Sequence, residues 1–445
     1  MSPEPFAHEY PDVHAPAKPA PDASVPPAVT KPATGRYSRI FEIAGSAFFS
    51  VGFLARLPLA MLTIGALTLV TSITGSYGQG GFAAGAVGLG SALGAPLLGY
   101  LADRIGQRPL LLGTAVANPL MILAVLWTAS QLPGGGPLAA VLAAAFAMGA
   151  SAAQVGPLAR VRWMSLTARD RTGQELGTAL SYESMADELS FVLGPALVGL
   201  LAASVAPWLP LALAAALSAT MVTAFALHRT VDAVQPSPRR RRAANGARAS
   251  KDRSEGVSWA LLALPVLGMV AMGTFFGATQ ASLTAFGGSF GIADAAGLLY
   301  SVMGISSAAA ALSVAFWPEK FSQSARWVMS AFAMTGAAML LLLPGGVPEM
   351  LVVLFILGIP VGPTMVSIFG IGAQLAPRHL MGTVMTLLAS GTVTGTAIGS
   401  ALAGPLAEDY GHGAAFWVSA GAAAALLVLG LASSVAVRRG KKEPA

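Results

Sequence analysis

Three carboxylates occur within one apolar stretch of this 445-residue sequence. Glu183, Asp187 and Glu188 lie between residues 177 and 203, which are otherwise apolar enough to cross a lipid bilayer. An ionised side chain at the centre of a bilayer costs at least about 2.5 kcal/mol, so such groups mark functional sites. In a helix, Glu183 and Asp187 share one face, whereas Glu188 lies about 100° further round.

The chemistry open to these acids is proton binding. Burial and a like-charged neighbour both favour the neutral form of a carboxyl group, so one of the three could bind and release a proton near neutral pH. The candidate counter-charge is Arg56, which is followed by Pro58 in the first apolar segment. We expect Arg56 and Glu183 to pair at similar depth. Two alternatives remain open: Arg56 reaching the membrane interface, and the acids serving a purely structural ion-pair network.

The composition requires a membrane. Charged residues make up 10% of the chain, against about 25% in soluble domains. Hydrophobic residues make up 55%, and the absence of cysteine excludes disulfides, cysteine-ligated metals and thiol catalysis. Because lipid offers the backbone no hydrogen-bond partner, long apolar segments are helical. We expect an all-α membrane protein with twelve transmembrane helices, at 48–73, 81–101, 109–129, 137–160, 177–203, 207–228, 258–285, 295–316, 326–344, 348–373, 382–406 and 413–436.

The basic residues predict the orientation. All 26 lysines and arginines except Arg56 fall in the two tails, the central stretch or one set of loops. The positive-inside rule therefore places both termini in the cytoplasm and the protein in the plasma (inner) membrane as a multi-pass protein. On this scheme Arg160 and Arg162 are anchors at the cytoplasmic end of the fourth segment.

The chain divides into two halves. We expect a disordered Pro-rich cytoplasmic tail over 1–40, six-helix bundles over 41–228 and 258–437, a basic linker over 229–257 and a basic tail over 438–445. The linker contains four consecutive arginines, 239–242, which we interpret as a topology determinant, the alternative being a patch for nucleic acid or anionic lipid.

Short internal repeats support two six-helix pseudo-repeats. The tetrapeptide Gly-Ser-Tyr-Gly at 75–78 recurs as Gly-Ser-Phe-Gly at 288–291, and Ala-Ala-Gly at 83–85 recurs at 295–297. Duplication of a six-helix unit relates the copies by an axis along the membrane normal.

The loop after the second segment carries a motif. Residues 99–108 read Gly-Tyr-Leu-Ala-Asp-Arg-Ile-Gly-Gln-Arg. This stretch resembles the signature of the major facilitator superfamily, Gly-x-Leu-x-Asp-Arg-x-Gly-x-Arg, and keeps every defining position. A carboxylate at a helix end, a glycine turn and two arginines form a cluster that can dock on a helix terminus. The alternative is a solvated turn. The residues of this cytoplasmic gate motif are Gly99, Asp103, Arg104, Gly106 and Arg108.

The resemblance implies a fold and roles for these residues. It implies the fold of that superfamily, with Asp103 and Arg108 holding the two halves together on the cytoplasmic side when the outer side is open, and Asp103 near the start of the eleventh segment, around Gly382. A second resemblance, to the Gly-Pro motif of antiporters in the family, rests on Gly194, Pro195 and Gly199, although Ser190 stands where a glycine is usual.

Together these features predict a secondary active transporter working by alternating access. We expect proton-coupled efflux of a small amphipathic compound or drug, the alternative being proton symport or uniport uptake of a metabolite. Gln154, Phe275, Phe276 and Gln280 are weak candidates for the substrate path, each equally compatible with helix packing. We expect no cofactor beyond the proton gradient, no metal, no nucleic-acid partner and a functional monomer.

A membrane-embedded enzyme is the rival class of function. The five histidines lie in tails, loops or helix ends, and Asp187 is the only aspartate predicted within the bilayer. Neither a buried serine nor an aspartate pair therefore has the partner that catalysis needs. We expect the protein not to be an enzyme.

Overall fold

The computed structural model describes residues 35–168, 174–234, 259–292, 296–318 and 320–440. Regular structure within these residues is entirely helical. Twelve spans are long and apolar enough to cross a membrane, which confirms the predicted number. They are Ser46–Thr74, Gln79–Ile105, Gln107–Gly134, Leu138–Leu166, Gln174–Ala202, Leu209–Leu227, Ala260–Ser289, Gly297–Phe316, Gln323–Leu342, Val347–Leu375, Met381–Tyr410 and His412–Ala436.

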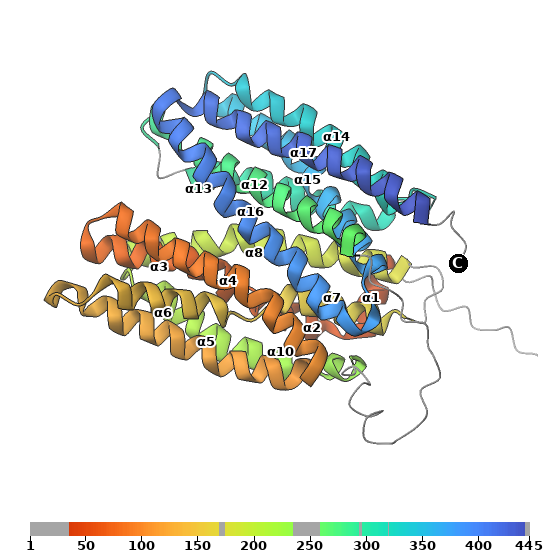
Figure 1. Ribbon diagram of the computed structural model, residues 1–445, viewed down its shortest axis with the longest axis horizontal. Helices are drawn as coiled ribbons and strands as arrows, with labels where there is room; N and C mark the ends of the chain where they lie inside the picture. The colour runs from red at the N-terminus through yellow and green to blue at the C-terminus, as the bar shows by residue number, and fades with distance from the viewer. Residues whose placement is uncertain (1–34, 169–173, 235–258, 293–295, 319, 441–445) are drawn as a thin grey trace, which may run out of the picture. The chain divides into compact units, whose positions relative to one another are not determined.

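The helices fall into two groups along the chain, coloured from red to yellow-green and from green to blue in Figure 1. The first half contains α1 (Arg36–Ala44), α2 (Ser46–Leu54), α3 (Leu57–Thr74), α4 (Tyr77–Ile105), α5 (Gln107–Ser130), η1 (Leu132–Gly134), α6 (Leu138–Ala150), α7 (Val155–Leu166), α8 (Gln174–Ser204), α9 (Leu209–Leu217), the π-helical η2 (Ser218–Val222), α10 (Thr223–Leu227) and η3 (Arg229–Ala233). The second half contains α12 (Trp259–Ser289), α13 (Ala296–Ser313), η5 (Val314–Phe316), α14 (Gln323–Met339), η6 (Leu340–Leu342), α15 (Val347–Leu375), η7 (Arg378–Leu380), α16 (Met381–Tyr410) and α17 (His412–Gly440).

Two of the spans expected to be continuous helices are broken. The first span breaks at Ala55 and Arg56, between α2 and α3, and the fourth breaks at 151–154, between α6 and α7. Pro58 and Pro157 follow these breaks, in the first turns of α3 and α7. A proline has no N–H and its ring clashes with the carbonyl four residues earlier, so the preceding helix ends and a new one starts. Arg56 is consequently the N-cap residue of α3, in the middle of a span.

The two halves meet chiefly along two helix pairs, α4 with α16 and α8 with α13, with further contacts of α8 with α15 and of α7 with α16. The two main pairs consist of the second and fifth spans of each half, so each half uses chiefly the same two elements to contact the other. Two duplicated bundles related by a pseudo-two-fold axis would show this reciprocal contact between equivalent helices. One large core cluster fills the second half, and two clusters fill the first.

The described chain begins with a helix where the sequence predicts a tail. The first five residues of α1, 36–40, belong to the segment expected to be disordered, and Ile40 is fully buried. At the other end α17 extends to Gly440, past the predicted boundary at 437. The arginine run at 239–242 lies outside the described residues.

Candidate functional site

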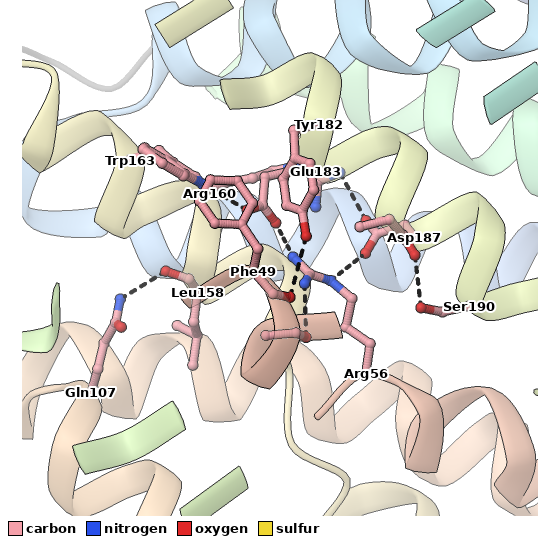
Figure 2. Close-up of polar contacts among 12 residues, drawn as sticks. Phe49, Arg56, Gln107, Leu158, Arg160, Trp163, Tyr182, Glu183, Asp187 and Ser190 are labelled. Carbon is pink, nitrogen blue, oxygen red and sulfur yellow. Dashed lines mark hydrogen bonds and ion pairs between the residues drawn. The ribbon is translucent and has the colours of Figure 1, made fainter. Parts of the chain in front are cut away.

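A buried network of four charged side chains lies where α2, α3, α7 and α8 meet (Figure 2). Arg56 forms an ion pair with Glu183 through Nη2 and places Nε 2.9 Å from Asp187 Oδ1. Arg160 Nη2 lies 2.8 Å from Asp187 Oδ2 in an ion pair. Arg56 is 6% exposed, and Arg160 and Glu183 are fully buried. The predicted pairing of Arg56 with Glu183 is therefore present.

Uncharged groups add hydrogen bonds to two members of this network, Arg56 and Glu183, whereas Nε and Nη1 of Arg160 have no hydrogen-bond partner among the described residues. Arg56 Nη1 donates to the carbonyl of Gly52 at 2.8 Å, in the last turn of α2 before the break. The indole Nε1 of Trp163 donates to Glu183 Oε1 at 2.7 Å. Each oxygen of the Glu183 carboxylate thus has its own donor, Arg56 for one and Trp163 for the other.

The position of Arg160 differs from the prediction. The sequence suggests an anchor at the membrane surface, but the start of α7 after the break places Arg160 in the interior. Its guanidinium carbon lies 3.9 Å from the centre of the Phe369 ring on α15, a cation–π contact. Since α15 belongs to the second half, Arg160 connects the ionic network to both halves.

Arg162 is also buried, which corrects its assignment as an interfacial anchor. Its Nε donates to Gln107 Oε1 at 2.9 Å, and its Nη1 donates to the carbonyl of Phe225 at 2.9 Å and to Thr230 Oγ1 at 3.0 Å. These contacts join α5, α7, α10 and η3. Arg162 therefore stabilises the first half internally and contributes no charge to the network around Arg56.

Glu188 differs from the two neighbouring acids on α8. The network contains two arginines and two carboxylates, so its formal charges balance. Glu188 is only 7% exposed, and its Oε1 has no hydrogen-bond partner among the described residues. Of the three candidate acids, Glu183 and Asp187 therefore belong to the charge-balanced network, and Glu188 is separate from it.

The gate motif lies at the end of the bundle where α4 ends and α16 begins, which we call the motif end. Asp103 accepts three hydrogen bonds there: from the backbone N–H of Gly382 at 2.9 Å, and from the backbone N–H and hydroxyl of Thr383, each at 2.7 Å. A carboxylate at a helix N-terminus is favoured because the first N–H groups have no partner within the helix. The predicted contact between Asp103 and Gly382 is present and joins the two halves.

Two positions of the motif require glycine, each for a different structural reason. A Cβ at Gly99 would lie 1.9 Å from Thr386 Oγ1 and 2.7 Å from the Gly382 carbonyl, so only glycine permits this crossing of α4 and α16. Gly106 has a φ of 94°, which lets the chain turn directly from α4 into α5.

The ring contact and the ion pair of the motif's two arginines lie within the first half. Arg104 lies over the ring of Tyr100 on its own helix, with its guanidinium carbon 4.9 Å from the ring centre. Arg108 lies 3.9 Å from Asp232 in η3, and both side chains are substantially exposed. The ion pair given for Arg108 therefore lies within its own half, and its expected role in holding the halves together with Asp103 stays a prediction.

Helix α1 makes a further connection between the halves at the motif end. Arg36 donates to the carbonyl of Ala315, and the Tyr37 hydroxyl donates to the carbonyl of Leu312 at 2.5 Å. Both acceptors lie at the end of α13 and η5, where helix carbonyls have no partner within the helix. Burial raises the pKa of Tyr37 to about 12, so this phenol remains a donor across the physiological range.

We expect Tyr37→Phe to loosen α1 without affecting the ionic network. One hydrogen bond to a neutral acceptor contributes about 0.5–1.5 kcal/mol, which is a several-fold change in the opening equilibrium of α1. Hydrogen exchange of the α1 amides should therefore accelerate several-fold. Arg39→Gln, which removes ion pairs to Glu42 and Glu175 within the first half, is the control. Equal effects of the two substitutions would show that the hydrogen bond to α13 stabilises α1 no more than the ion pairs within the first half do.

The remaining predicted residues have mixed placements. Pro195 lies inside α8, and a Cβ at Gly194 would lie 2.6 Å from the Ala60 Cβ, so this glycine lets α8 approach α3 closely. Gly199 faces open space. The candidates for the substrate path are likewise divided: Gln154 is buried beside the break before α7, Phe275 belongs to the core of the second half, Phe276 packs against it and Gln280 is exposed.

The fold and the buried site define a polytopic membrane transporter built from two six-helix halves. The family model described as Major Facilitator Superfamily matches residues 48–391, and the chain belongs to this superfamily. Its members are transporters, so the expected absence of an enzymatic function agrees with the family.

Solved structures with the same fold are distant in sequence. The human organic anion transporter MFSD10 (TETRAN) superposes with a TM-score of 0.65 at 20% identity, covering 86% of this chain and 99% of its own. A bacterial homologue of the iron transporter ferroportin in an outward-facing state gives 0.67 at 14%, covering 88% and 99%. The transporter FucP in the outward conformation gives 0.62 at 13%, covering 87% and 99%. No curated protein matches the sequence.

Proposed function

We propose that this transporter exports a small amphipathic compound in exchange for protons, by alternating access. The observation that carries the proposal is the position of Glu188: two arginines and two acids neutralise one another in the network around Arg56, and Glu188, buried next to them on α8, forms no ion pair with any of the described residues. An acid that the fold leaves uncompensated inside the membrane is suited to bind a proton in one state and release it in another.

The state of the structure fits alternating access. The halves are joined at the motif end by Asp103 and by α1. The positive-inside rule assigns the motif end to the cytoplasm, so we assign the structure to the outward-facing state. Two similar structures, the ferroportin homologue and FucP, are described as outward-facing. Release of the Asp103 contacts would then open the cytoplasmic side.

The direction of coupling can be tested in proteoliposomes with ethidium, a permanent cation that a pH gradient alone does not redistribute. Antiport predicts that ethidium enters vesicles faster when their lumen is acidic, and that collapsing the gradient with nigericin abolishes the acceleration. Protein-free vesicles are the control. Acceleration by the reversed gradient would instead establish symport, and uptake indifferent to the gradient would establish uniport. Failure to move ethidium or any of a panel of amphipathic dyes would contradict drug efflux.

A further inference from the structure

The interface between α8 and α13 contains three buried polar atoms without hydrogen-bond partners. They are Glu188 Oε1 and Ser184 Oγ on α8 and Ser307 Oγ on α13. Ser184 and Ser307 are fully buried. Unsatisfied buried polar groups are rare in folded proteins because each costs about 1–3 kcal/mol. Glu188 and Ser307 interact across this interface, but their carboxyl and hydroxyl groups form no well-aligned hydrogen bond.

The register of the two helices brings these atoms together. Leu180 and Ala311 belong to one buried cluster at one level, and a Cβ at Gly304 would meet the Val192 side chain at another. Ser184 and Glu188 follow Leu180 at intervals of four residues and so share its face of α8. Ser307 precedes Ala311 by four residues on α13, and it interacts with Glu188. The site therefore lies between the two halves.

Positive charge is lacking around Glu188. On α8 its titratable neighbour is Asp187, which is already paired with Arg56 and Arg160. Tyr300 is the only titratable residue of α13 and is close enough to interact with Glu188. The sequence of α15, which also packs on α8, contains a single charged residue, Glu349 in its first turn. None of these groups can neutralise an ionised Glu188.

We propose that Glu188, Ser184 and Ser307 form a binding site for one proton at the contact between the halves. In the closed contact Glu188 is the neutral acid, whose O–H donates to a serine hydroxyl. When the halves separate and water enters, the proton leaves to water and the carboxylate remains. Glu183 and Asp187 keep their ion pairs with Arg56 and Arg160. The assignment rests on the proposed function only for the link between this proton and transport.

Infrared spectroscopy of the purified full-length protein tests the assignment without any substrate. We expect a protonated-carboxyl band near neutral pH that is lost as the pH rises and is absent in Glu188→Gln. Glu408→Gln, outside the predicted apolar segments, is the matched control and should keep the band. A band that persists unchanged in Glu188→Gln, or no such band in the wild type, would overturn the proposal.

Thermal stability gives a second, independent measurement. Glutamine cannot ionise, so Glu188→Gln should unfold at the wild-type temperature in mildly acidic buffer and at a higher temperature in mildly alkaline buffer. A lower unfolding temperature at both pH values would overturn the proposal, because it would show that the carboxylate has a stabilising partner. Replacing potassium by sodium in the buffer should change neither result. Stabilisation by sodium that requires Glu188 would show a metal-cation site instead.

These readouts separate the proton site from the transport function. If the infrared band and the pH dependence of stability both require Glu188 while no pH gradient drives flux, the proton site is supported and proton-coupled transport is contradicted. If flux is proton-driven and the band is unaffected by Glu188→Gln, another group carries the proton.

Discussion

Glu183→Gln is expected to lower the free energy of unfolding by about 3–5 kcal/mol. Removing one partner of a buried ion pair leaves the other charge uncompensated in a medium that cannot solvate it. Arg56 would keep Asp187, but that carboxylate is already shared with Arg160. Trp163 would also lose its ionised acceptor. The unfolding temperature of the purified protein, compared with that of the wild type, measures the effect.

A double substitution provides the control for charge balance. Arg56→Gln with Glu183→Gln leaves Arg160 and Asp187 as a balanced pair, so the double variant should be more stable than either single variant. Two substitutions in contact show such coupling, whereas independent sites add. Additive losses in the double variant would contradict the account of a charge-balanced network.

Asp103→Asn is expected to open the motif end. The asparagine amide retains one acceptor oxygen, and its NH₂ group faces donors that the carboxylate oxygen now satisfies. Hydrogen bonds to a charged group contribute about 1.5–3 kcal/mol, so the equilibrium between closed and open motif ends should shift by about tenfold or more. Thr386, which is buried at the crossing of α4 and α16, is a suitable reporter. Because the chain contains no cysteine, Thr386→Cys can be labelled specifically, and its labelling rate should rise about tenfold with Asp103→Asn.

Arg108→Gln is the matched control for Asp103→Asn. It alters the same motif, but the ion pair that Arg108 makes among the described residues is with the exposed Asp232 in its own half. Exposed ion pairs contribute at most about 1 kcal/mol. Labelling at position 386 should therefore stay near the wild-type rate. An equal rise in both variants would show that general loosening of the motif, and not the contact of Asp103 with α16, controls this end.

The number of spans and the contact of Asp103 with the start of α16 could be predicted from the sequence, because each depends on a strong local signal. The length of each apolar segment identifies a span, and the motif between the second and third spans identifies Asp103. The breaks in the first and fourth spans depend on Pro58 and Pro157, which the sequence shows but whose effect inside a membrane is not fixed, since such helices also tolerate proline. The sequence does not predict the break before α7, and so it places Arg160 at the membrane surface and not in the interior.

The composition of the site was predicted in part. The pairing of Arg56 with Glu183 could be predicted because both lie at similar depth. The participation of Arg160, and which arginine pairs with which acid, could not be predicted. One signal was present: three acids and one arginine inside the spans leave an excess of negative charge, which calls for a second arginine. The separation of Glu188 depends on its facing α13 and not α7, a property of packing between halves. The ion pair of Arg108 with Asp232 could not be predicted, because the motif fixes the position of Arg108 but not the direction of its side chain.

The most direct test of proton-coupled alternating access is the distance between the halves at the motif end as a function of pH. Spin labels at Ile105→Cys and Lys320→Cys, both exposed and one in each half, report this distance. Raising the pH should populate a longer distance in the wild type, because an ionised Glu188 is unfavourable in the closed contact, and Glu188→Gln should keep the short distance at every pH. A distance that does not respond to pH in the wild type, or that responds equally in Glu188→Gln, would contradict the account.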